Sequence, residues 1–391
     1  MTLIAATIAG ETPVLISDFL SSTPSHGDNH EAVPTYVNVN STLPPEWGIK
    51  TGTLYRKSAI INKHFTVGGA GSLIVISSFM KLLFEKFHEA APTQGQLIEF
   101  FKEHDDLPTL QSSCAIIGWF IENNKPVSFR YVSNESPNLE FGGSYIEGSG
   151  AKLFKEKVWS KKSEEWGALP FSHAQKYCFE RIAVLIANEM SNGISISNFF
   201  GGGYDLILYD GKEFTTQGDV SYLILTIEML DYISGKKLAF LSANGNFYKP
   251  ESPELGANPK SPVLLKIGYA EEFPVIRSVI PRNNFLNVGS LESEGVFVVE
   301  PLATKGGKGQ KLSRTYHTDE FPYFGEYLMV AVWGVMPTGE KSVFIASVRG
   351  NEARSFHLEP SDKAGKVKFY FPSAITNNIL LKAKAYFNPE Q

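Results

Sequence analysis

The chain opens with Met1-Thr2-Leu3-Ile4-Ala5-Ala6-Thr7, an apolar run that predicts a strand with a threonine close to its head. An initiator methionine before a side chain as small as Thr2 is a usual target for methionine aminopeptidase. Its removal would leave a free threonine, whose hydroxyl can attack a carbonyl while its own α-amine takes up the proton. The alternative is an ordinary initiator methionine followed by an edge strand.

Length and composition bound the class of protein. A chain of 391 residues exceeds a typical domain and predicts two domains. The hydrophobic share of 43% and the charged share of 20% indicate a globular protein. A net charge of −5 argues against a protein held to nucleic acid by phosphate contacts.

The compartment is predicted from three features. The sequence has no run of about 18 apolar residues, so we expect no membrane span. The opening run lacks a basic segment and is interrupted by Glu11 and Pro13, which makes it a poor signal peptide. Cys114 and Cys178 lie in apolar stretches and are interpreted as buried thiols, with a disulfide between them as the alternative. We therefore expect a cytoplasmic protein.

The first part of the chain mixes predicted strands and helices. Two short strands at 2–8 and 13–19 precede a polar, turn-rich segment at 21–52 that we interpret as an insertion. Apolar residues at helical spacing predict helices at 73–90, 94–104 and 171–191. Further strands are expected at 58–67, 114–122, 126–132, 141–147 and 204–210. Two sets of strands with helices between and behind them predict an α+β four-layer sandwich, in a domain of residues 1–250.

The pattern changes beyond about residue 260. Apolar alternation without a convincing helix predicts strands at 263–269, 296–300, 327–334, 342–348, 353–358, 366–372 and 378–386. Short strands separated by turns indicate an all-β sandwich domain at 260–391. The segment at 216–260 is ambiguous, because residues 220–230 fit either a strand or a helix and residues 250–262 are typical of a linker.

Five local features follow one another in a characteristic order: Thr2, Asp18, Lys57, Gly71 and Gly148-Ser149-Gly150. Asp18 stands sixteen positions after Thr2, and Gly71 stands fourteen positions after Lys57, where the first long helix is expected. In order, spacing and context, residues 2–210 resemble the proteasome β-subunit and the HslV peptidase, which are N-terminal nucleophile (Ntn) hydrolases. The region beyond about residue 260 has no counterpart in that resemblance.

The resemblance implies a role for each feature. Thr2 would be the nucleophile, Lys57 would lower its pKa, and Asp18 would hold that lysine by charge. The backbone N–H of Gly71 would donate to the oxyanion at the entry to the helix. Ser149 would support the amine of the threonine. The resemblance implies no metal and no cofactor.

The end of the pattern departs from the family. The family keeps an aspartate after the long helix and, three residues later, a serine before two glycines. The best match here is Asn198-Phe199-Phe200-Gly201-Gly202-Gly203, in which Asn198 replaces the aspartate and Gly201 replaces the serine. Asp205 lies nearby, but its place inside a predicted strand makes it a poor substitute. These losses favour weak or absent catalysis as an alternative.

We therefore expect a threonine-type peptidase that hydrolyses peptide or protein substrates after the loss of Met1. By resemblance it would be a ring-like homo-oligomer with an unidentified regulator, and the C-terminal domain would serve oligomerisation or substrate recruitment. One alternative is a catalytically weak or inactive scaffold or binding protein with the same fold. The other is an unrelated two-domain binding protein or another amidase.

Overall fold

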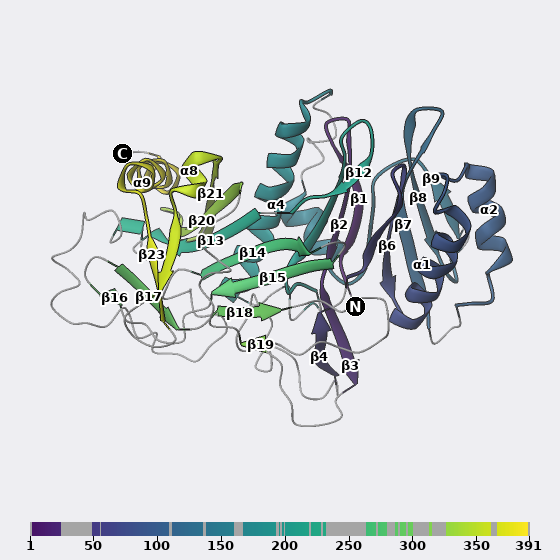
Figure 1. The fold of residues 1–391 in the computed structure, drawn as a ribbon, viewed down its shortest axis with the longest axis horizontal. Coiled ribbons are helices and arrows are strands. Elements are labelled where there is room, and N and C mark those ends of the chain that lie inside the picture. Colours follow the sequence, from purple (N-terminus) through teal and green to yellow (C-terminus); the bar gives the residue numbers. More distant parts are fainter. Residues whose placement is uncertain are drawn as a thin grey trace.

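The computed structural model combines several mainly antiparallel sheets with a few helices (Figure 1). It describes residues 2–24, 49–54, 56–108, 112–135, 138–159, 167–192, 195, 198, 200–218, 220–227, 230–231, 263–270, 273–279, 286–287, 290–294, 296–299, 313–314, 326–360 and 366–389. Met1 and most of the predicted insertion at 21–52 lie outside these ranges. Among the helices within them, none has the length and apolarity needed to cross a membrane.

A five-stranded sheet carries the N-terminal strand. Its order is β10 (Tyr145–Glu147), β1 (Ile4–Ala9), β2 (Thr12–Asp18), β11 (Tyr204–Tyr209) and β12 (Phe214–Thr216). The β1–β2 register pairs Ile4 with Ser17, and the β2–β11 register pairs Asp18 with Tyr204. The head of β1, the end of β2 and the start of β11 therefore meet at one end of this sheet, in its three central strands.

A second five-stranded antiparallel sheet faces the first. Its order is β5 (Ser58–Asn62), β6 (Phe65–Gly71), β7 (Cys114–Glu122), β8 (Lys125–Val132) and β9 (Leu139–Phe141). The prediction of one strand at 58–67 is wrong, because β5 and β6 form a hairpin there. The Asn62 side chain closes the turn by accepting the His64 N–H at 2.8 Å.

Alternation along the strands builds the core between the two sheets. Ile4 and Ala6 of β1 point toward the second sheet and pack with Ala115 and Ile117 of β7. Leu3 and the residues in step with it point the other way, toward α4 (Phe171–Asn192). The outer face of the second sheet is covered by α1 (Leu73–Phe87) and α2 (Gln94–Glu103). These helices lie close to the predicted ranges.

The C-terminal part forms a seven-stranded sheet beside α4. Its order is β19 (Ser313–Arg314), β18 (Val296–Val299), β15 (Phe273–Val279), β14 (Val263–Ala270), β13 (Val220–Thr226), β20 (Tyr327–Val335) and β21 (Lys341–Arg349). The ambiguous residues around 220 are thus a strand, and β13 pairs with β20 in parallel. The predicted division at 250–260 stays a prediction, although β13 joins the sheet built by later residues.

The prediction of an all-β C-terminal region is wrong. Residues 378–386 belong to α9 (Ser373–Phe387), which packs on the seven-stranded sheet. Its buried residues Leu380, Ala383 and Phe387 follow helical spacing, while Leu381 is exposed. The strand expected at 353–358 is also replaced in part by the short helix α8 (Asn351–Arg354). Four strands form a further sheet: β16 (Leu286–Asn287), β17 (Ser290–Glu294), β23 (Lys366–Tyr370) and β22 (His357–Pro360).

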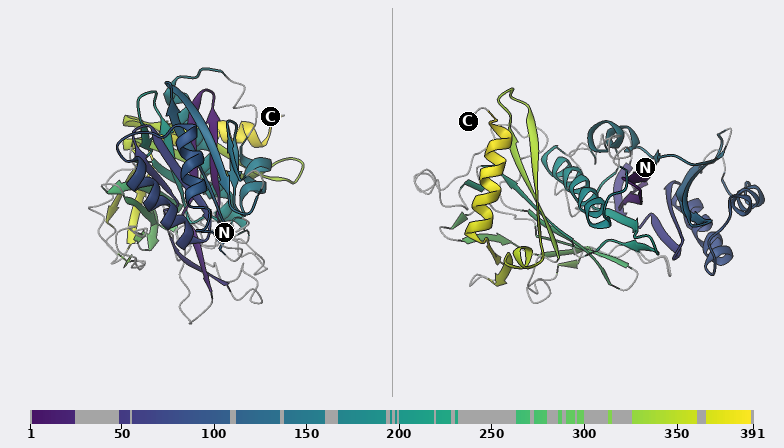
Figure 2. Two further views of the ribbon diagram at one scale, coloured as in Figure 1. Left: turned by 90° about the vertical axis from the view of Figure 1, so that its right-hand side faces the viewer. Right: turned by 90° about the horizontal axis from the view of Figure 1, so that it is seen from above.

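Helix α4 lies between two sheets of the same chain. Tyr222 of β13 and Met329 of β20 belong to the same apolar cluster as Leu3 of β1 and Ile182 of α4. Figure 2 shows the layers in succession, from α9 through the seven-stranded sheet and α4 to the two five-stranded sheets and α1. Both cysteines are free and buried.

Candidate active site

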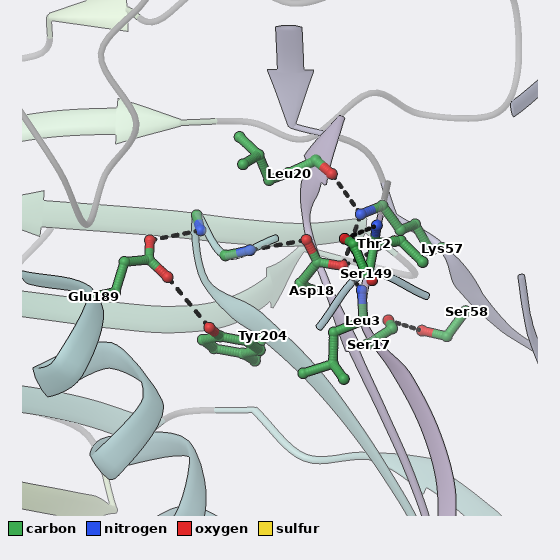
Figure 3. A network of polar contacts seen from close by, with 12 residues as sticks. Thr2, Leu3, Ser17, Asp18, Leu20, Lys57, Ser58, Ser149, Glu189 and Tyr204 are labelled. Carbon is green, nitrogen blue, oxygen red and sulfur yellow. Dashed lines mark hydrogen bonds and ion pairs between the residues drawn. The ribbon is translucent and has the colours of Figure 1, made fainter. Parts of the chain in front are cut away.

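The carboxylate of Asp18 gathers the donors of the site at the end of β2 (Figure 3). Its Oδ1 accepts the Thr2 hydroxyl at 2.9 Å and the Lys57 ammonium at 2.7 Å. The same oxygen accepts the Leu3 N–H at 2.8 Å, and Oδ2 accepts the Gly201 N–H at 2.9 Å. Asp18 is fully buried, so its charge is balanced by these donors rather than by water.

Lys57 is held in a buried position by two acceptors. Besides Asp18, its ammonium donates to the Leu20 carbonyl at the start of the ribbon formed by β3 (Leu20–Pro24) and β4 (Ile49–Leu54). Burial lowers the pKa of Lys57, and the charge and hydrogen bond of Asp18 act in the opposite direction. A lysine of this kind can exchange a proton more readily than a solvated one. The ribbon lies between Asp18 and Lys57 in the sequence, and its two strands are at the ends of the predicted insertion.

The backbone of Thr2 is fixed against the turn that follows β10. Its N–H donates to Ser149 Oγ at 3.2 Å, and its carbonyl accepts Ser149 Oγ at 3.3 Å and the Gly150 N–H at 3.2 Å. Gly148 has a φ of +93°, and a Cβ there would lie 2.8 Å from the Thr2 carbonyl carbon. Glycine is therefore required for the close approach. Ser149 is exposed, whereas Thr2 is 1% exposed.

Gly71 lies at the end of β6, directly before α1. Its φ of +110° is favourable only for glycine, and a Cβ would lie 2.9 Å from the Cα of Cys114. The same strand reaches the site, because the Gly69 N–H donates to the Lys57 carbonyl at 2.8 Å. Gly71 is exposed. Its predicted role as an oxyanion donor stays a prediction.

Asn198 lies at the surface. Its side chain is exposed, and its backbone N–H donates to the Ser195 carbonyl at 3.0 Å. The side-chain hydrogen bonds described for Thr2 and Asp18 join them to each other, to Lys57 and to backbone groups. The structure thus brings Thr2, Asp18, Lys57 and Ser149 together, and these contacts do not include Asn198.

Asp205 binds the two residues on either side of Lys57, at the start of β5. Its carboxylate accepts Arg56 Nε at 2.8 Å and the Ser58 hydroxyl, and Ser58 also accepts the Ser17 hydroxyl at 3.1 Å. Arg56 and Ser58 flank Lys57, and side chains alternate along an extended chain, so Lys57 can point toward Asp18 while its neighbours hold Asp205. From sequence, Asp205 was considered only as a replacement for the missing aspartate, and its contacts with Arg56 and Ser58 were not predicted.

A second buried carboxylate, Glu189, lies on α4 behind Asp18. The sequence contained a signal for it, since Glu189 follows Leu185 and Ile186 at helical spacing on the buried face. A charge on such a face is rarely left without a partner. Among the described residues, no group of His, Cys, Asp and Glu side chains is arranged to hold a metal ion.

No protein-family model matches the sequence, and no curated protein matches it either.

The burial of Lys57 predicts a pH dependence of stability. Burial lowers the folded-state pKa below 10.5, so between the two values the unfolded chain binds more protons than the folded chain. The free energy of unfolding therefore increases as the pH rises between these two pKa values and decreases as the pH falls.

The reference for this prediction is the variant Asp18→Asn/Lys57→Met, which removes both charges. We expect urea unfolding to show the wild-type chain gaining stability relative to the variant as the pH rises from neutrality toward 10.5, the ordinary pKa of lysine. The comparison cancels the titration of tyrosines, which both chains share. A stability difference that stays constant over this range would contradict the prediction.

Proposed function

We propose that the chain is a threonine-type Ntn hydrolase that cleaves peptide bonds through Thr2 after the loss of Met1. In this proposal α1 and α2, the two five-stranded sheets and α4 are the αββα sandwich of that fold. One observation carries it: the Thr2 hydroxyl and the Lys57 ammonium converge on a single buried oxygen of Asp18.

The reaction begins when the free α-amine of Thr2 takes the proton of its own hydroxyl. The hydroxyl oxygen attacks the carbonyl carbon of the scissile peptide bond, and the Lys57 ammonium stabilises the developing alkoxide. The Gly71 N–H would donate to the tetrahedral oxygen, a contribution of about 3–4 kcal/mol. The C–N bond then breaks, the leaving amine takes the proton, and the acyl group stays on Thr2 as an ester. Water hydrolyses this ester and restores the hydroxyl.

Ser149 supports the amine in this scheme. The Thr2 nitrogen lies 3.2 Å from Ser149 Oγ, which is within hydrogen-bond reach. Once Met1 is removed, this nitrogen is the amine, and the serine hydroxyl can orient it or pass on its proton. Ser149 itself is exposed to solvent.

The proposal is tested by intact mass and by covalent labelling of the full chain. We expect Met1 to be absent and a β-lactone to add one inhibitor mass at Thr2. An epoxyketone should add as well, because it reacts with both the hydroxyl and the amine. Thr2→Ala should abolish both adducts, and Thr2→Ser should keep them. A chain without Met1 that forms no adduct would overturn the proposal.

The second candidate is a proteasome-like scaffold or binding protein with little or no activity. It is favoured by the burial of Thr2, which is 1% exposed, and by the surface position of Asn198. A retained Met1, or peptides that bind to the full chain without being cut, would support this candidate. Native mass spectrometry of the same sample tests the proposed ring-like homo-oligomer by counting subunits.

A further inference from the structure

The loop Gly201–Gly203 separates two buried carboxylates. Asp18 lies on one side of it and Glu189 on the other, and Figure 3 shows Glu189 on the far side of Asp18 from Thr2 and Lys57. Both side chains are fully buried. The loop joins the two carboxylates, because the Gly202 N–H donates to Glu189 and the Gly201 N–H donates to Asp18.

Glu189 accepts hydrogen bonds from one backbone N–H and two side-chain hydroxyls. Its Oε1 accepts the Gly202 N–H at 2.8 Å. Its Oε2 accepts the Ser195 hydroxyl at 2.9 Å and the Tyr204 hydroxyl at 3.2 Å. Burial, together with the nearby charge of Glu189, raises the pKa of Tyr204 well above its ordinary value, so this hydroxyl stays a donor.

Successive N–H groups of the loop serve the two carboxylates. The Gly202 N–H goes to Glu189, and the Gly201 N–H goes to Asp18 Oδ2 at 2.9 Å. The Gly201 carbonyl accepts the Leu20 N–H at 2.9 Å, and the Leu20 carbonyl in turn accepts the Lys57 ammonium. The backbone of Gly201 therefore contacts both partners of the buried ion pair. Its N–H binds Asp18 directly, and its carbonyl holds Leu20, which accepts the Lys57 ammonium.

The loop can take this path only with glycine. Gly201 has a φ of +129°, and a Cβ there would lie 2.5 Å from the carboxyl carbon of Glu189 and 2.7 Å from its Oε1. The Glu189 carboxylate thus occupies the space that a side chain at position 201 would need. The sequence resemblance predicts a serine at position 201, where this chain has glycine. The carboxylate of Glu189, which lies on α4, fills the space beside that glycine.

We propose that Glu189 is a positioning residue that holds the Gly201–Gly203 loop so that the Gly201 N–H donates to Asp18. It thereby sets the orientation of the carboxylate shared by Thr2 and Lys57. The effect on catalysis rests on the proposed function, whereas the effect on the loop does not. A hydrogen bond to a charged group is worth a factor of roughly 10 to 100 in an equilibrium, which sets the size of the expected effects.

The first test needs no activity. Amide hydrogen exchange by NMR on the full chain should be faster by roughly 10-fold or more at Gly201 and Gly202 in Glu189→Ala. Glu189→Gln keeps an oxygen acceptor for Gly202 and should restore most of the protection. Tyr204→Phe is the matched control, because it removes one donor to Glu189 but keeps the Gly202 contact, and it should leave Gly201 close to wild type. Where Glu189→Ala does not fold, Glu189→Asp should show the same direction of change.

The second test measures labelling of Thr2 by a β-lactone as a function of pH. Glu189→Ala should slow labelling by roughly 10-fold or more and shift the midpoint of its pH profile, while Tyr204→Phe changes neither. Faster exchange at Gly202 alone, or a lower melting temperature with an unchanged pH profile, would overturn the proposal. If the wild-type chain is not labelled, the proposed function fails, and the exchange measurement still decides the role of Glu189.

Discussion

Lys57→Met is expected to lower the free energy of unfolding by about 3–5 kcal/mol. The side chain of Asp18 is fully buried, and that of Lys57 is 4% exposed, so the substitution leaves a carboxylate in the interior without its cation. Hydrogen bonds from the Thr2 hydroxyl and two backbone N–H groups remain, but they bring no positive charge. Urea unfolding followed by circular dichroism measures the loss.

The double variant Asp18→Asn/Lys57→Met separates the ion pair from simple loss of packing. It removes both charges, so we expect it to be more stable than Lys57→Met alone. With Asp18→Asn as the fourth member, the double-mutant cycle gives the coupling between the two side chains. A Lys57→Met chain within about 1 kcal/mol of wild type would contradict a buried ion pair at this site.

The same substitution tests the assignment of Lys57 to catalysis. If the ammonium stabilises the alkoxide of Thr2, Lys57→Met should slow β-lactone labelling by roughly 10²–10³-fold, the range typical of a lost electrostatic stabiliser. Labelling is measured without urea, so that the signal comes from folded protein. An unchanged rate in the folded variant would remove Lys57 from the mechanism and leave it a structural role.

The parts of the fold that could be predicted from sequence are those set by local periodicity. Helix α4 covers 171–192, close to the predicted 171–191, because its apolar residues repeat at helical spacing over many turns. Helix α9 was missed because Leu381, Ala383 and Ala385 alternate with Lys382 and Lys384, which is typical of a strand. The packing of Leu380, Ala383 and Phe387 on the neighbouring sheet decides for the helix.

In the candidate site, too, the residues that could be predicted from sequence are those placed by local structure. The juxtaposition of Thr2 and Asp18 could be predicted, because one hairpin brings together the two strands that carry them and its register is local. Glu189, Gly201 and Asp205 reach the site from segments far along the chain. Their positions depend on how α4 and β11 pack against β2, and no spacing within one strand or helix encodes that. The carbonyl of Leu20 carries no side-chain signal at all.

Gly148→Ala is expected to disrupt the head of β1. The effect should exceed that of an alanine substitution at a described glycine whose added Cβ would meet no other atom. A Cβ at this position would lie 2.8 Å from the carbonyl carbon of Thr2 and 2.9 Å from its Cγ2, and closer still to the carbonyl oxygen. These atoms belong to the residue proposed as the nucleophile, so relief requires Thr2 to move. A displacement of about 1 Å in a reacting group can cost roughly 10²-fold in rate.

Gly211→Ala provides the matched control for this prediction. Gly211 has a φ of +95°, against +93° for Gly148, but an added Cβ would meet nothing within 4 Å. Its cost therefore reports backbone strain alone, about 1–3 kcal/mol. Gly148→Ala should lose a further 1–3 kcal/mol or so from overpacking and should lose β-lactone labelling, whereas Gly211→Ala should keep it. Equal stability and equal labelling in the two variants would mean that Thr2 is not held against the turn after β10, and the geometry of the nucleophile would have to be revised.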